Sequence, residues 1–358
     1  MKILVGMSGG VDSSVVACLL KQQGHEVIGA TMSIWDKNTN FRGNMSADSC
    51  FSPHEEQDIE AARALCQDLD IPYYVLDCSE RYKQMVLDNF KQEYKAGRTP
   101  NPCVMCNSYI KFNALPEEAR AKGLDFDKFA TGHYARINFN ENTKRYEIKR
   151  GVDYTKDQSY FLYRLSQEQL SRVLMPLGDY SKKQVRAMAT EFGLKVSDKP
   201  DSQDFYSGDI NDILQNEPQI GNFVTRDGRI LGQHKGYWNY TIGQRRGMGI
   251  AAEHPLYVLA INKDKNEVVV GFEEECAQSG LIAENFCWSA IEKPAETLEC
   301  EAKIRSAQQP AAVKVNLLEN NVVQVVFYTK QKAIAPGQSV VLYQNDVVLG
   351  GGIIKSAI

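Results

Sequence analysis

The sequence predicts an α/β protein: a parallel sheet covered by helices, then a small central domain, then an antiparallel β-barrel. Up to about residue 170, apolar runs suited to buried strands alternate with amphipathic helical segments, the pattern of a parallel sheet. A turn rich in glycine and serine joins the first strand to the first helix. Beyond residue 273, apolar and polar residues alternate between turn signals, which indicates antiparallel strands. We therefore expect three domains, residues 1–170, 171–273 and 274–358.

The composition is that of a globular protein, and 358 residues are enough for two or three cores. No apolar run has the length of a membrane span, and the chain begins with a core strand instead of a signal peptide, so we expect a cytoplasmic protein. Nine cysteines, an odd number, are not typical of a secreted disulfide framework. Most should fill the core, namely Cys18, Cys66, Cys78, Cys276, Cys287 and Cys300.

The formal net charge of −4 argues against a protein that coats nucleic acid without selectivity. A specific RNA partner would need a local basic surface. The chain has four short basic segments for this purpose, although each also suits an ordinary solvated loop: 144–150, 226–229, 245–246 and 330–332.

The segment Ser8–Ser14, which reads Ser-Gly-Gly-Val-Asp-Ser-Ser, is the centre of the predicted site. It follows the buried strand Ile3–Met7 and opens an amphipathic helix. Gly9 and Gly10 allow backbone conformations closed to other residues, so main-chain N–H groups can approach an anion closely. The helix start adds unpaired N–H donors and a partial positive charge. This loop is therefore predicted to bind a pyrophosphate.

Two other phosphate loops are excluded by spacing. The chain has no Gly-x-x-x-x-Gly-Lys-Ser/Thr, and Gly6, Gly9 and Gly10 do not match Gly-x-Gly-x-x-Gly. The Ser8–Ser14 segment instead resembles the signature of the PP-loop ATP pyrophosphatases, which are adenine nucleotide alpha hydrolase-like. Members of that superfamily split ATP into AMP and pyrophosphate and so adenylate an oxygen of a substrate. The signature itself does not name the substrate.

The rest of the chain continues the predicted architecture. In the first domain we expect strands at 26–35, 73–78 and 128–137, helices at 59–69, 81–94 and 110–122, and a long polar loop at 36–52. Gly132 and His133 are expected to end or interrupt the last of these strands, in the same sheet. Farther along we expect helices at 167–172 and 182–192, a hairpin at 257–261 and 267–270, and antiparallel strands from 281 onward. One of these strands has Cys300, Ala302 and Ile304 facing one way and Glu301, Lys303 and Arg305 facing the other.

Cys103 and Cys106 leave a stiff loop, because Pro100 and Pro102 oppose helix before them. They lie one turn apart at a predicted helix start, a position that lowers the pKa of a thiol. A zinc site would need a second ligand pair, which the sequence lacks, and a thioredoxin-type pair does not suit a nucleotide loop. We favour a site that handles sulfur or binds a cluster.

Several motifs, in order and over essentially the whole chain, resemble the tRNA-specific 2-thiouridylases. Besides Ser8–Ser14 they are Cys106-Asn107, Thr131–Ala135, Lys156–Leu162, Leu165–Gln167, Pro176–Gly178, Lys199–Asp204, Tyr240–Gly247, Ala335–Ser339 and Leu349–Ile354. The resemblance implies ATP-dependent 2-thiolation of the wobble uridine, position 34, of tRNA. The C2 oxygen would be adenylated and then replaced by sulfur, with release of AMP and pyrophosphate.

The resemblance also implies roles for individual residues. Cys106 would be the catalytic nucleophile, and Asp12 would hold the metal or align the loop. ATP, with Mg²⁺, would be bound by Gly6, Met7, Ser8, Gly9, Gly10, Val11, Asp12, Ser13, Met32 and Gly132. The tRNA would contact Asn101 and Pro102 at the target base, and Lys156, Asp157, Gln158, Arg305 and Ser306 elsewhere. The target base would have to leave its stack to reach the site.

The chain departs from the family at one place. Most members carry a second cysteine, which receives the incoming persulfide, where this chain has Tyr206. A phenol cannot carry that sulfur, so Cys103 is the expected substitute and would form a disulfide bond with Cys106 after transfer. Alternatively, Cys103 and Cys106 bind an iron–sulfur cluster with a third ligand such as Cys50. Cys50 also suits a spare loop thiol.

The resemblance implies further partners: Lys, Glu and Gln tRNAs through their anticodon arms, and a sulfur-relay protein or cysteine desulfurase as donor. We expect no membrane partner, and a monomer. Two alternatives stay open. One is a PP-loop synthetase of the amidotransferase type, although no glutaminase-like domain is evident. The other is a tRNA-binding protein that lost its activity together with the cysteine at position 206.

Overall fold

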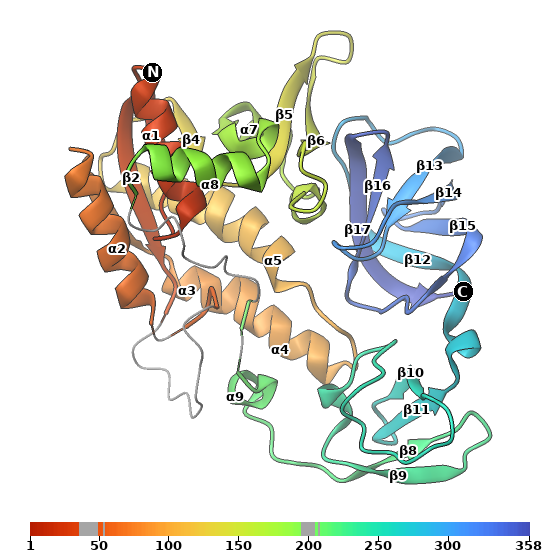
Figure 1. Cartoon of the computed structure of the whole chain (residues 1–358). Helices are drawn as coiled ribbons and strands as arrows, with labels where there is room; N and C mark the ends of the chain where they lie inside the picture. The colour runs from red at the N-terminus through yellow and green to blue at the C-terminus, as the bar shows by residue number, and fades with distance from the viewer. Residues whose placement is uncertain (36–48, 53, 195–204, 207) are drawn as a thin grey trace.

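The computed structural model describes residues 1–35, 49–52, 54–194, 205–206 and 208–358, which form three parts (Figure 1). A parallel sheet with helices on both faces is followed by a small middle sheet and then by a closed barrel. These are the architectures that the sequence predicts. The motif at 199–204 and most of the loop predicted at 36–52 lie outside the described residues.

The N-terminal sheet is parallel throughout, in the order β3-β2-β1-β4-β7. The strand order reverses beside β1, and sheets of this kind bind ligands outside the carboxyl ends of their strands at such a switch point. The Ser8–Ser14 loop leaves β1 at this place. The strands are β1 Lys2–Gly6, β2 Glu26–Ser33, β3 Tyr73–Asp77, β4 Lys128–Ala130 and β7 Val173–Leu174.

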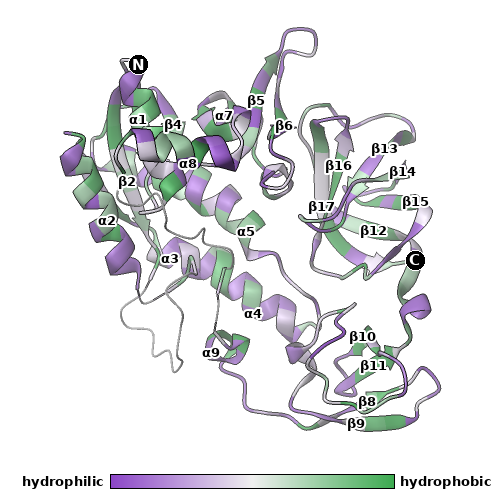
Figure 2. Ribbon diagram, viewed as in Figure 1, coloured by the Kyte–Doolittle hydropathy of each residue, from purple (hydrophilic) through white to green (hydrophobic). Residues whose placement is uncertain are grey.

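Successive residues of β1 face opposite sides of the sheet and fill two separate cores. Ile3 and Val5 pack with α1 (Val11–Gln22), α2 (Glu55–Asp68) and α8 (Lys182–Glu191). Leu4, fully buried on the other face, packs with the remaining helices of this part. Figure 2 shows both hydrophobic and hydrophilic residues around helices such as α2 and α4, as expected for helices that lie on a core. The helices on the face of Leu4 are α3 (Ser79–Tyr82), α4 (Asp88–Lys95), α6 (Leu115–Ala121) and two π-helical segments, η1 (Lys83–Leu87) and η2 (Cys106–Ala114).

The strand predicted at 128–137 is interrupted at Gly132 and His133, as expected, but its two halves belong to different sheets. Residues 128–130 form β4 of the parallel sheet, whereas β5 (Ala135–Asn140) pairs with β6 (Arg145–Arg150) in a hairpin on the barrel sheet. The chain changes direction at Thr131–Tyr134, where a β-carbon at Gly132 would come within 2.9 Å of the Asp12 side chain. The close approach of the α1 N-terminus thus ends the strand.

The middle part is a sheet in the order β10-β11-β8-β9 around a small apolar cluster that includes Phe223, Val258 and Val268. The predicted hairpin is confirmed, since β10 and β11 pair antiparallel. The elements here are α9 (Ile210–Leu214), β8 (Gly221–Val224), β9 (Ile230–His234), β10 (Tyr257–Asn262) and β11 (Glu267–Gly271), with short 3₁₀ turns at η5 (Tyr237–Asn239) and η6 (Glu273–Cys276).

The predicted barrel is confirmed. Its strands follow the order β12-β15-β14-β13-β16-β17, and β17 pairs with β12 to close it. Strand β17 also pairs with β6 at Val347 and Lys149, so the hairpin of the N-terminal part extends the barrel sheet. The strands are β12 Ala277–Trp288, β13 Leu298–Lys303, β14 Ala311–Leu317, β15 Val323–Lys332, β16 Ser339–Gln344 and β17 Val347–Ala357.

Residues beyond 170 still take part in the N-terminal sheet. Strand β7 pairs with β4, and α8 packs on α1 through Val185 and Ala189. These contacts extend the first structural unit past the boundary expected near residue 170. Between β6 and α8 lie η3 (Ser159–Phe161), α7 (Gln167–Ser171) and η4 (Pro176–Asp179).

No disulfide joins any of the nine cysteines, all of which the structure describes. The expectation of core cysteines is confirmed for the four that are buried, whereas Cys287 and Cys300 are half-buried and Cys50 is exposed. Within the described ranges, no helix combines the length and apolar character needed to cross a bilayer. The four buried cysteines are Cys18, Cys66, Cys78 and Cys276.

Candidate active site

The phosphate loop is held in shape by its own serines. The Ser13 hydroxyl accepts a hydrogen bond from the Ser8 N–H at 3.1 Å, and the Ser14 hydroxyl donates to the Gly10 carbonyl at 2.7 Å. Helix α1 starts at Val11, and no side chain in the described part of the protein caps its first turn at Gly10. The first N–H groups of α1 are thus available to an anion.

Gly9 shows why this loop needs glycine. Its φ angle is +68°, and a β-carbon there would lie 2.5 Å from the carbonyl oxygen of Asp58 in α2. A side chain would be strained by the backbone conformation and would also push α2 away. The close packing of α2 on the loop leaves the main chain of Gly9 as the surface of a narrow cradle.

Asp12 lies in the first turn of α1 within a buried polar network. Its carboxylate forms an ion pair with Lys182 at 2.8 Å and accepts a hydrogen bond from the Tyr134 hydroxyl at 2.8 Å. Lys182 is only 8% exposed and belongs to the start of α8. The network therefore ties α1 to α8 and to the segment after β4, which favours the aligning role of Asp12 over the metal-binding one.

Sequence reasoning missed Lys182 and Tyr134 as members of the site. Tyr134 stands in the Thr131–Ala135 motif, so that motif was a usable signal. Lys182 stands in an amphipathic helix start, Ser181-Lys182-Lys183, where nothing distinguishes the buried lysine from its exposed neighbour Lys183. Only the packing of α8 on α1 separates the two.

The other predicted ATP residues lie near the loop. The backbone of Gly132 approaches Asp12 and the Ser13 nitrogen so closely that a β-carbon would be 2.9 and 3.1 Å away. Met7 donates its N–H to the Ala30 carbonyl at 2.8 Å, which ties the loop to β2. Met32 is half-buried near the carboxyl end of β2. The tertiary structure thus gathers these residues at one edge of the sheet.

The cysteine segment begins a helix, as predicted. The Asn101 side chain caps α5 (Pro102–Met105) by accepting from the Val104 N–H at 3.3 Å, and Pro102 occupies the first helical turn. The helix continues as the π-helical η2 from Cys106. The sequence did not predict this π-helix, a form that is uncommon and often found at functional sites.

The predicted low pKa of Cys106 is wrong for this structure. Burial raises the pKa of the Cys106 thiol to about 11, and the nearby positive charge of Lys111 opposes this rise. Desolvation of the thiolate thus outweighs the helix start. The same Lys111 charge adds to burial in lowering the pKa of His133, which is buried and hydrogen-bonded to Thr131 at 2.8 Å.

The barrel holds the loop that carries Asn101. Gln338 donates to the carbonyl oxygens of Thr99 at 3.0 Å and Pro100 at 2.9 Å, and Thr99 donates its N–H to Pro336 at 2.8 Å. A β-carbon at Gly337 would lie 2.7 Å from the Thr99 oxygen. The Ala335–Ser339 motif thus positions the start of the cysteine helix from the far end of the chain.

In the segment 156–158, Asp157 is buried, whereas its neighbours Lys156 and Gln158 are half-buried. Asp157 is buried and accepts hydrogen bonds from the N–H groups of Gly151 at 3.3 Å and Ser159 at 3.1 Å. It also forms ion pairs with Arg150 at 3.5 Å and Lys303 at 3.8 Å. Gln158 accepts from the Tyr134 N–H at 2.9 Å, and Lys156 is half-buried.

Lys303 departs from the alternation expected for β13, because it is buried. The sequence pattern places it on the outer face, but its exposure is 3%, because the segment around Asp157 covers that face. Burial lowers the pKa of Lys303, and the Asp157 charge opposes this shift. The pair thus fixes the N-terminal part to the barrel.

Arg305 lies at the junction of the middle part and the barrel. Its guanidinium donates to the carbonyl oxygens of Ile242 and Ala333, both at 3.2 Å, and the residue remains exposed. Ser306 beside it is half-buried. Both are far from the phosphate loop in the sequence.

Within the described ranges, no three His, Cys, Asp or Glu side chains are arranged to hold a metal ion. The iron–sulfur alternative on Cys103, Cys106 and a third thiol therefore gains no support from the described residues, and it stays a hypothesis. Mg²⁺ has other requirements, since it commonly takes most of its ligands from water and nucleotide phosphates.

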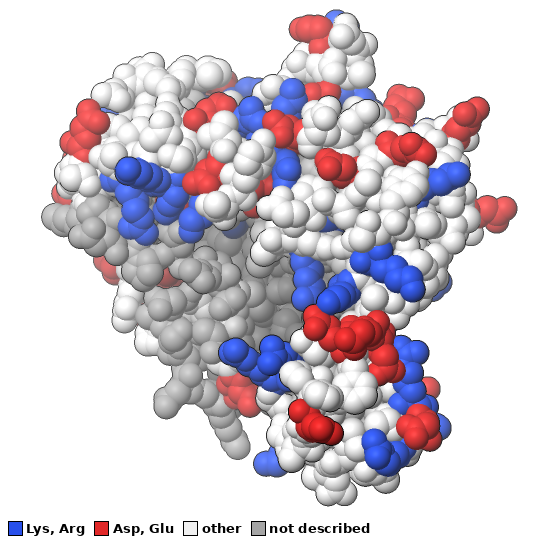
Figure 3. Space-filling model, turned by 45° about the vertical axis from the view of Figure 1, so that its right-hand side comes forward, with Lys and Arg blue, Asp and Glu red and all other residues white. Residues whose placement is uncertain are grey.

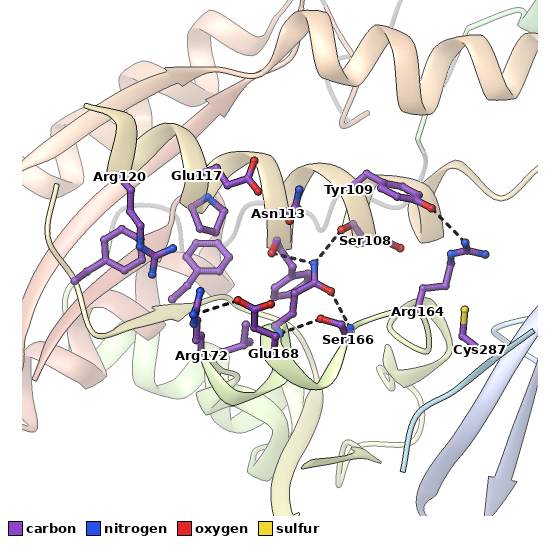
Figure 4. A pocket seen from close by; sticks show the side chains of 16 residues that line it. Ser108, Tyr109, Asn113, Glu117, Arg120, Arg164, Ser166, Glu168, Arg172 and Cys287 are labelled. Carbon is purple, nitrogen blue, oxygen red and sulfur yellow. Dashed lines mark hydrogen bonds and ion pairs between the residues drawn. The ribbon is translucent and has the colours of Figure 1, made fainter. Parts of the chain in front are cut away.

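A cavity of about 510 Å³ opens between η2, α6, α7 and β12 (Figure 4). Arg164 lies on its wall with its guanidinium hydrogen-bonded to the Tyr109 hydroxyl at 3.3 Å, and Cys287 lies beside it (Figure 4). None of the predicted ATP, thiol or tRNA residues lines this cavity. It is thus separate from the site gathered around the phosphate loop.

Basic side chains are distributed over the surface in separate groups with acidic residues between them, as the face in Figure 3 shows. The charge pattern is therefore patchy and does not form one continuous basic face in this view.

Comparisons with known proteins agree with these observations. Residues 1–206 match the model of a tRNA methyl transferase HUP domain, residues 210–272 a tRNA methyl transferase PRC-barrel domain, and residues 278–354 an aminomethyltransferase beta-barrel domain. The chain is 50% identical over 356 residues to the tRNA-specific 2-thiouridylase MnmA of Endomicrobium trichonymphae, covering 99% of both chains. It is 45% identical over 361 residues to the MnmA of Acetivibrio thermocellus, again covering 99% of both.

Among solved structures, the U34-tRNA thiolase NcsA from Methanococcus maripaludis with its 4Fe–4S cluster is 20% identical, with a TM-score of 0.36. The match covers 56% of this chain and 60% of that chain, and likeness at this level says nothing about function.

A parallel sheet with a Ser-Gly-Gly-Val-Asp-Ser loop at its switch point defines a PP-loop protein of the α/β class. The identity to full-length relatives goes further. The chain belongs to the tRNA-specific 2-thiouridylase family.

Proposed function

We propose that this chain is an ATP-dependent tRNA sulfurtransferase that replaces the C2 oxygen of the wobble uridine, position 34, by sulfur. One observation carries the proposal: the phosphate loop and Cys106 are linked by a short series of neighbours. Gly132 packs on Asp12, His133 follows it, and the His133 ring contacts Phe112, with centroids 5.4 Å apart, in the η2 segment that begins at Cys106. A nucleotide and a thiol can thus serve one substrate at the edge of the sheet.

The loop from Gly6 to Ser13 would bind ATP, and the main-chain N–H groups at the start of α1 would bind the leaving pyrophosphate. Negative charge builds on the pyrophosphate as the uridine oxygen attacks the α-phosphorus, so fixed N–H donors stabilise the transition state more than the ground state. Mg²⁺ would neutralise further phosphate charge when bound with ATP. Met32 and Gly132 would contact the adenosine.

Asp12 would act as a positioning residue in this step. Its pairing with Lys182 and Tyr134 fixes the first turn of α1 against the segment that carries Gly132. The two sides of the nucleotide site are therefore held in register by one carboxylate. Lys182, although buried, would bring a positive charge to the edge of the phosphate site.

Cys106 would be the nucleophile of the sulfur-transfer step. A thiolate is a far better carrier of sulfur than a hydroxyl, but its thiol pKa of about 11 leaves little thiolate at neutral pH. Lys111 favours the thiolate, and we propose that bound tRNA alters the burial that now disfavours it. The target base must be flipped out to reach a half-buried thiol.

The tRNA would be held by Asn101 and Pro102 near the base and by Lys156, Gln158, Arg305 and Ser306 along the backbone. Asp157 would serve indirectly, because it is buried and fixes the loop between Lys156 and Gln158. We also propose Lys, Glu and Gln tRNAs as substrates, a protein persulfide as the sulfur source, a monomeric enzyme, and the cytoplasm as the compartment where tRNA is met.

The test is nucleoside mass spectrometry of unmodified tRNA-Lys, tRNA-Glu and tRNA-Gln after incubation with the protein, ATP, Mg²⁺ and a persulfide or sulfide source. We expect 2-thiouridine at position 34, together with AMP and pyrophosphate in amounts that depend on tRNA. Binding of tRNA without either product would support the inactive alternative. Pyrophosphate release driven by ammonia and a small acid would support the synthetase alternative.

A further inference from the structure

Cys50 lies against the segment where the family's second cysteine is replaced by Tyr206. The next residue, Phe51, donates its N–H to the carbonyl oxygen of Phe205 at 3.0 Å. The Phe51 and Phe205 rings are stacked, with centroids 6.0 Å apart and an interplanar angle of 13°. The two dipeptides Cys50-Phe51 and Phe205-Tyr206 are therefore held together, although about 155 residues separate them in the sequence.

The same aromatic group leads from Cys50 to Cys106. Phe51 also stacks on Tyr82, with centroids 5.5 Å apart, and Tyr82 is only 1% exposed. Burial raises the pKa of the Tyr82 phenol, and the charges of Cys106, Cys50 and Cys103 raise it further. The charges of three thiols from two segments thus act on one buried phenol.

The Cys50 thiol also influences the Cys106 thiol. After burial and the Lys111 charge, the Cys50 thiol is the next influence on the pKa of Cys106, and it raises that pKa. This influence agrees with the ring contacts that join Phe51, next to Cys50, to Tyr82 and Phe205. Cys106 and Phe51 belong to the same apolar cluster, so these contacts follow from the packing of the fold.

Exposure distinguishes the two thiols. Cys50 is exposed, whereas Cys106 is half-buried, and neither forms a disulfide. A donor protein can reach an exposed thiol on a loop but not a thiol inside a nucleotide site. Tyr206, at the position of the missing cysteine, has its hydroxyl bound to Asp212 at 2.7 Å and offers no sulfur. An accessible thiol beside position 206 must therefore come from another segment of the chain, and Cys50 lies in such a segment.

We propose that Cys50 carries the incoming persulfide and does for this chain what the absent cysteine at position 206 does in other members. The inference rests on the proposed function. The two thiols near Tyr82 then have separate roles: Cys50 receives sulfur at the surface, and the half-buried Cys106 completes the transfer. Cys103 is not required as the carrier.

The chemistry balances as follows. The Cys50 thiolate takes the sulfane sulfur of a protein persulfide, which leaves as a thiol. The terminal sulfur of the Cys50 persulfide attacks C2 of the adenylated uridine, the C2–O bond breaks, and AMP leaves with its electron pair. The Cys106 thiolate then attacks the Cys50 sulfur, and the S–S electron pair passes to the sulfur on C2, which takes a proton. Cys50 and Cys106 end as a disulfide, which a dithiol reductant returns to two thiols.

The experiment uses the full chain with tRNA, ATP and a protein persulfide, in the wild type, Cys50→Ser and Cys103→Ser, with Cys287→Ser as a matched control. We expect Cys50→Ser to lose at least 100-fold in persulfide-supported 2-thiouridine formation and to keep tRNA-dependent pyrophosphate release within twofold. Millimolar inorganic sulfide should restore thiolation in Cys50→Ser, because hydrosulfide can attack the adenylated base directly. Cys103→Ser and Cys287→Ser should stay within threefold of the wild type.

A second measurement follows the sulfur atoms. A single turnover without reductant, then alkylation of free thiols and peptide mass spectrometry, should show a Cys50–Cys106 disulfide. A Cys103–Cys106 disulfide, wild-type turnover in Cys50→Ser, failure of sulfide to restore that variant, or an oxygen-labile iron–sulfur cluster lost with Cys50 would each overturn the inference. If the wild type itself makes no 2-thiouridine, the proposed function fails instead, and the two failures are distinguished.

Discussion

The phosphate loop and the thiol cluster are built in opposite ways. The loop is one continuous segment, and its serines and glycines set its shape through contacts within Ser8–Ser14. The three thiols whose charges act on Tyr82 come from separate segments and are called the thiol cluster here. Cys50 lies in one loop, and Cys103 and Cys106 lie at a helix start. The comparison shows that the backbone conformation of the loop is set largely within one segment, although α2 and the Asp12–Lys182 pair also hold it, whereas the thiols come from separate segments.

The largest effect is expected for Cys106→Ser, which should remove sulfur transfer and leave the nucleotide reaction intact. Cys106→Ser should lower 2-thiouridine formation by about 1,000-fold or more, because a hydroxyl is a poor substitute for a thiolate. Binding of ATP and tRNA-dependent pyrophosphate release should remain, since the loop does not use the thiol. The measurement is nucleoside mass spectrometry beside a pyrophosphate assay. Thiolation at the wild-type rate would remove Cys106 from the mechanism.

Gly9→Ala perturbs the phosphate loop and leaves the thiols unchanged. The substitution forces a β-carbon against the Asp58 carbonyl at a φ of +68°, so we expect a cost of about 1–3 kcal/mol, seen as roughly tenfold or greater loss of ATP affinity. Alkylation of Cys106 should be unchanged. Gly24→Ala is the control, because Gly24 has a φ of +81° but no neighbour within 4 Å of a new β-carbon. Equal ATP affinity in both variants would contradict the cradle.

Lys182→Met tests the network that aligns the loop. It leaves the Asp12 carboxylate with one partner fewer, and since that side chain is 27% exposed, we expect about 2 kcal/mol of lost stability, below the value for a fully buried pair. Thermal unfolding and ATP binding are the measurements. Lys183→Met changes the exposed neighbour and should alter neither. An unchanged melting temperature in Lys182→Met would show that the pair is not structural.

Lys111→Met probes the thiol side by pH. Burial raises the pKa of Cys106 to about 11 and Lys111 opposes the rise, so removal of Lys111 should raise that pKa further. Less thiolate then exists at any given pH, and alkylation of Cys106 at pH 8 should slow by about threefold to tenfold. The alkaline rise of the alkylation rate should move to higher pH. Lys111→Arg keeps the charge and should follow the wild type; a rate unchanged in Lys111→Met would exclude the electrostatic role.

The smallest effect is expected at Arg305, outside both regions. Arg305→Ala removes one cation at the junction of the middle part and the barrel, so tRNA binding should weaken by about threefold to tenfold and lose about one unit of its salt-dependence slope. Filter binding at several salt concentrations is the measurement. Lys314→Ala removes an exposed lysine of β14 and serves as the control. If both variants weakened tRNA binding equally, Arg305 would contribute only as one of many surface charges and not as a specific contact.

Elements with a strong local signal could be predicted from the sequence. The parallel sheet, the middle hairpin and the barrel follow from period and turn patterns, and the structure confirms them. The interruption of the strand at 128–137 was expected at Gly132 and His133, but the sequence did not show that its second half, β5, joins the barrel sheet, because that depends on tertiary pairing. Lys303 was misplaced for the same reason, since Asp157 from a distant segment covers its face of β13. Periodicity describes one element and not what later packs on it.

The residues alone determined the phosphate loop, because glycine and serine set its backbone conformation and its hydrogen bonds within seven positions. Only the tertiary structure decided three other contacts. Lys182 pairs with Asp12, the segment of Asp157 covers Lys303, and the segment of Cys50 lies against that of Tyr206. Each of these joins groups that are distant along the chain. Their closeness depends on which helix packs on which strand, and no local pattern of side chains encodes that choice.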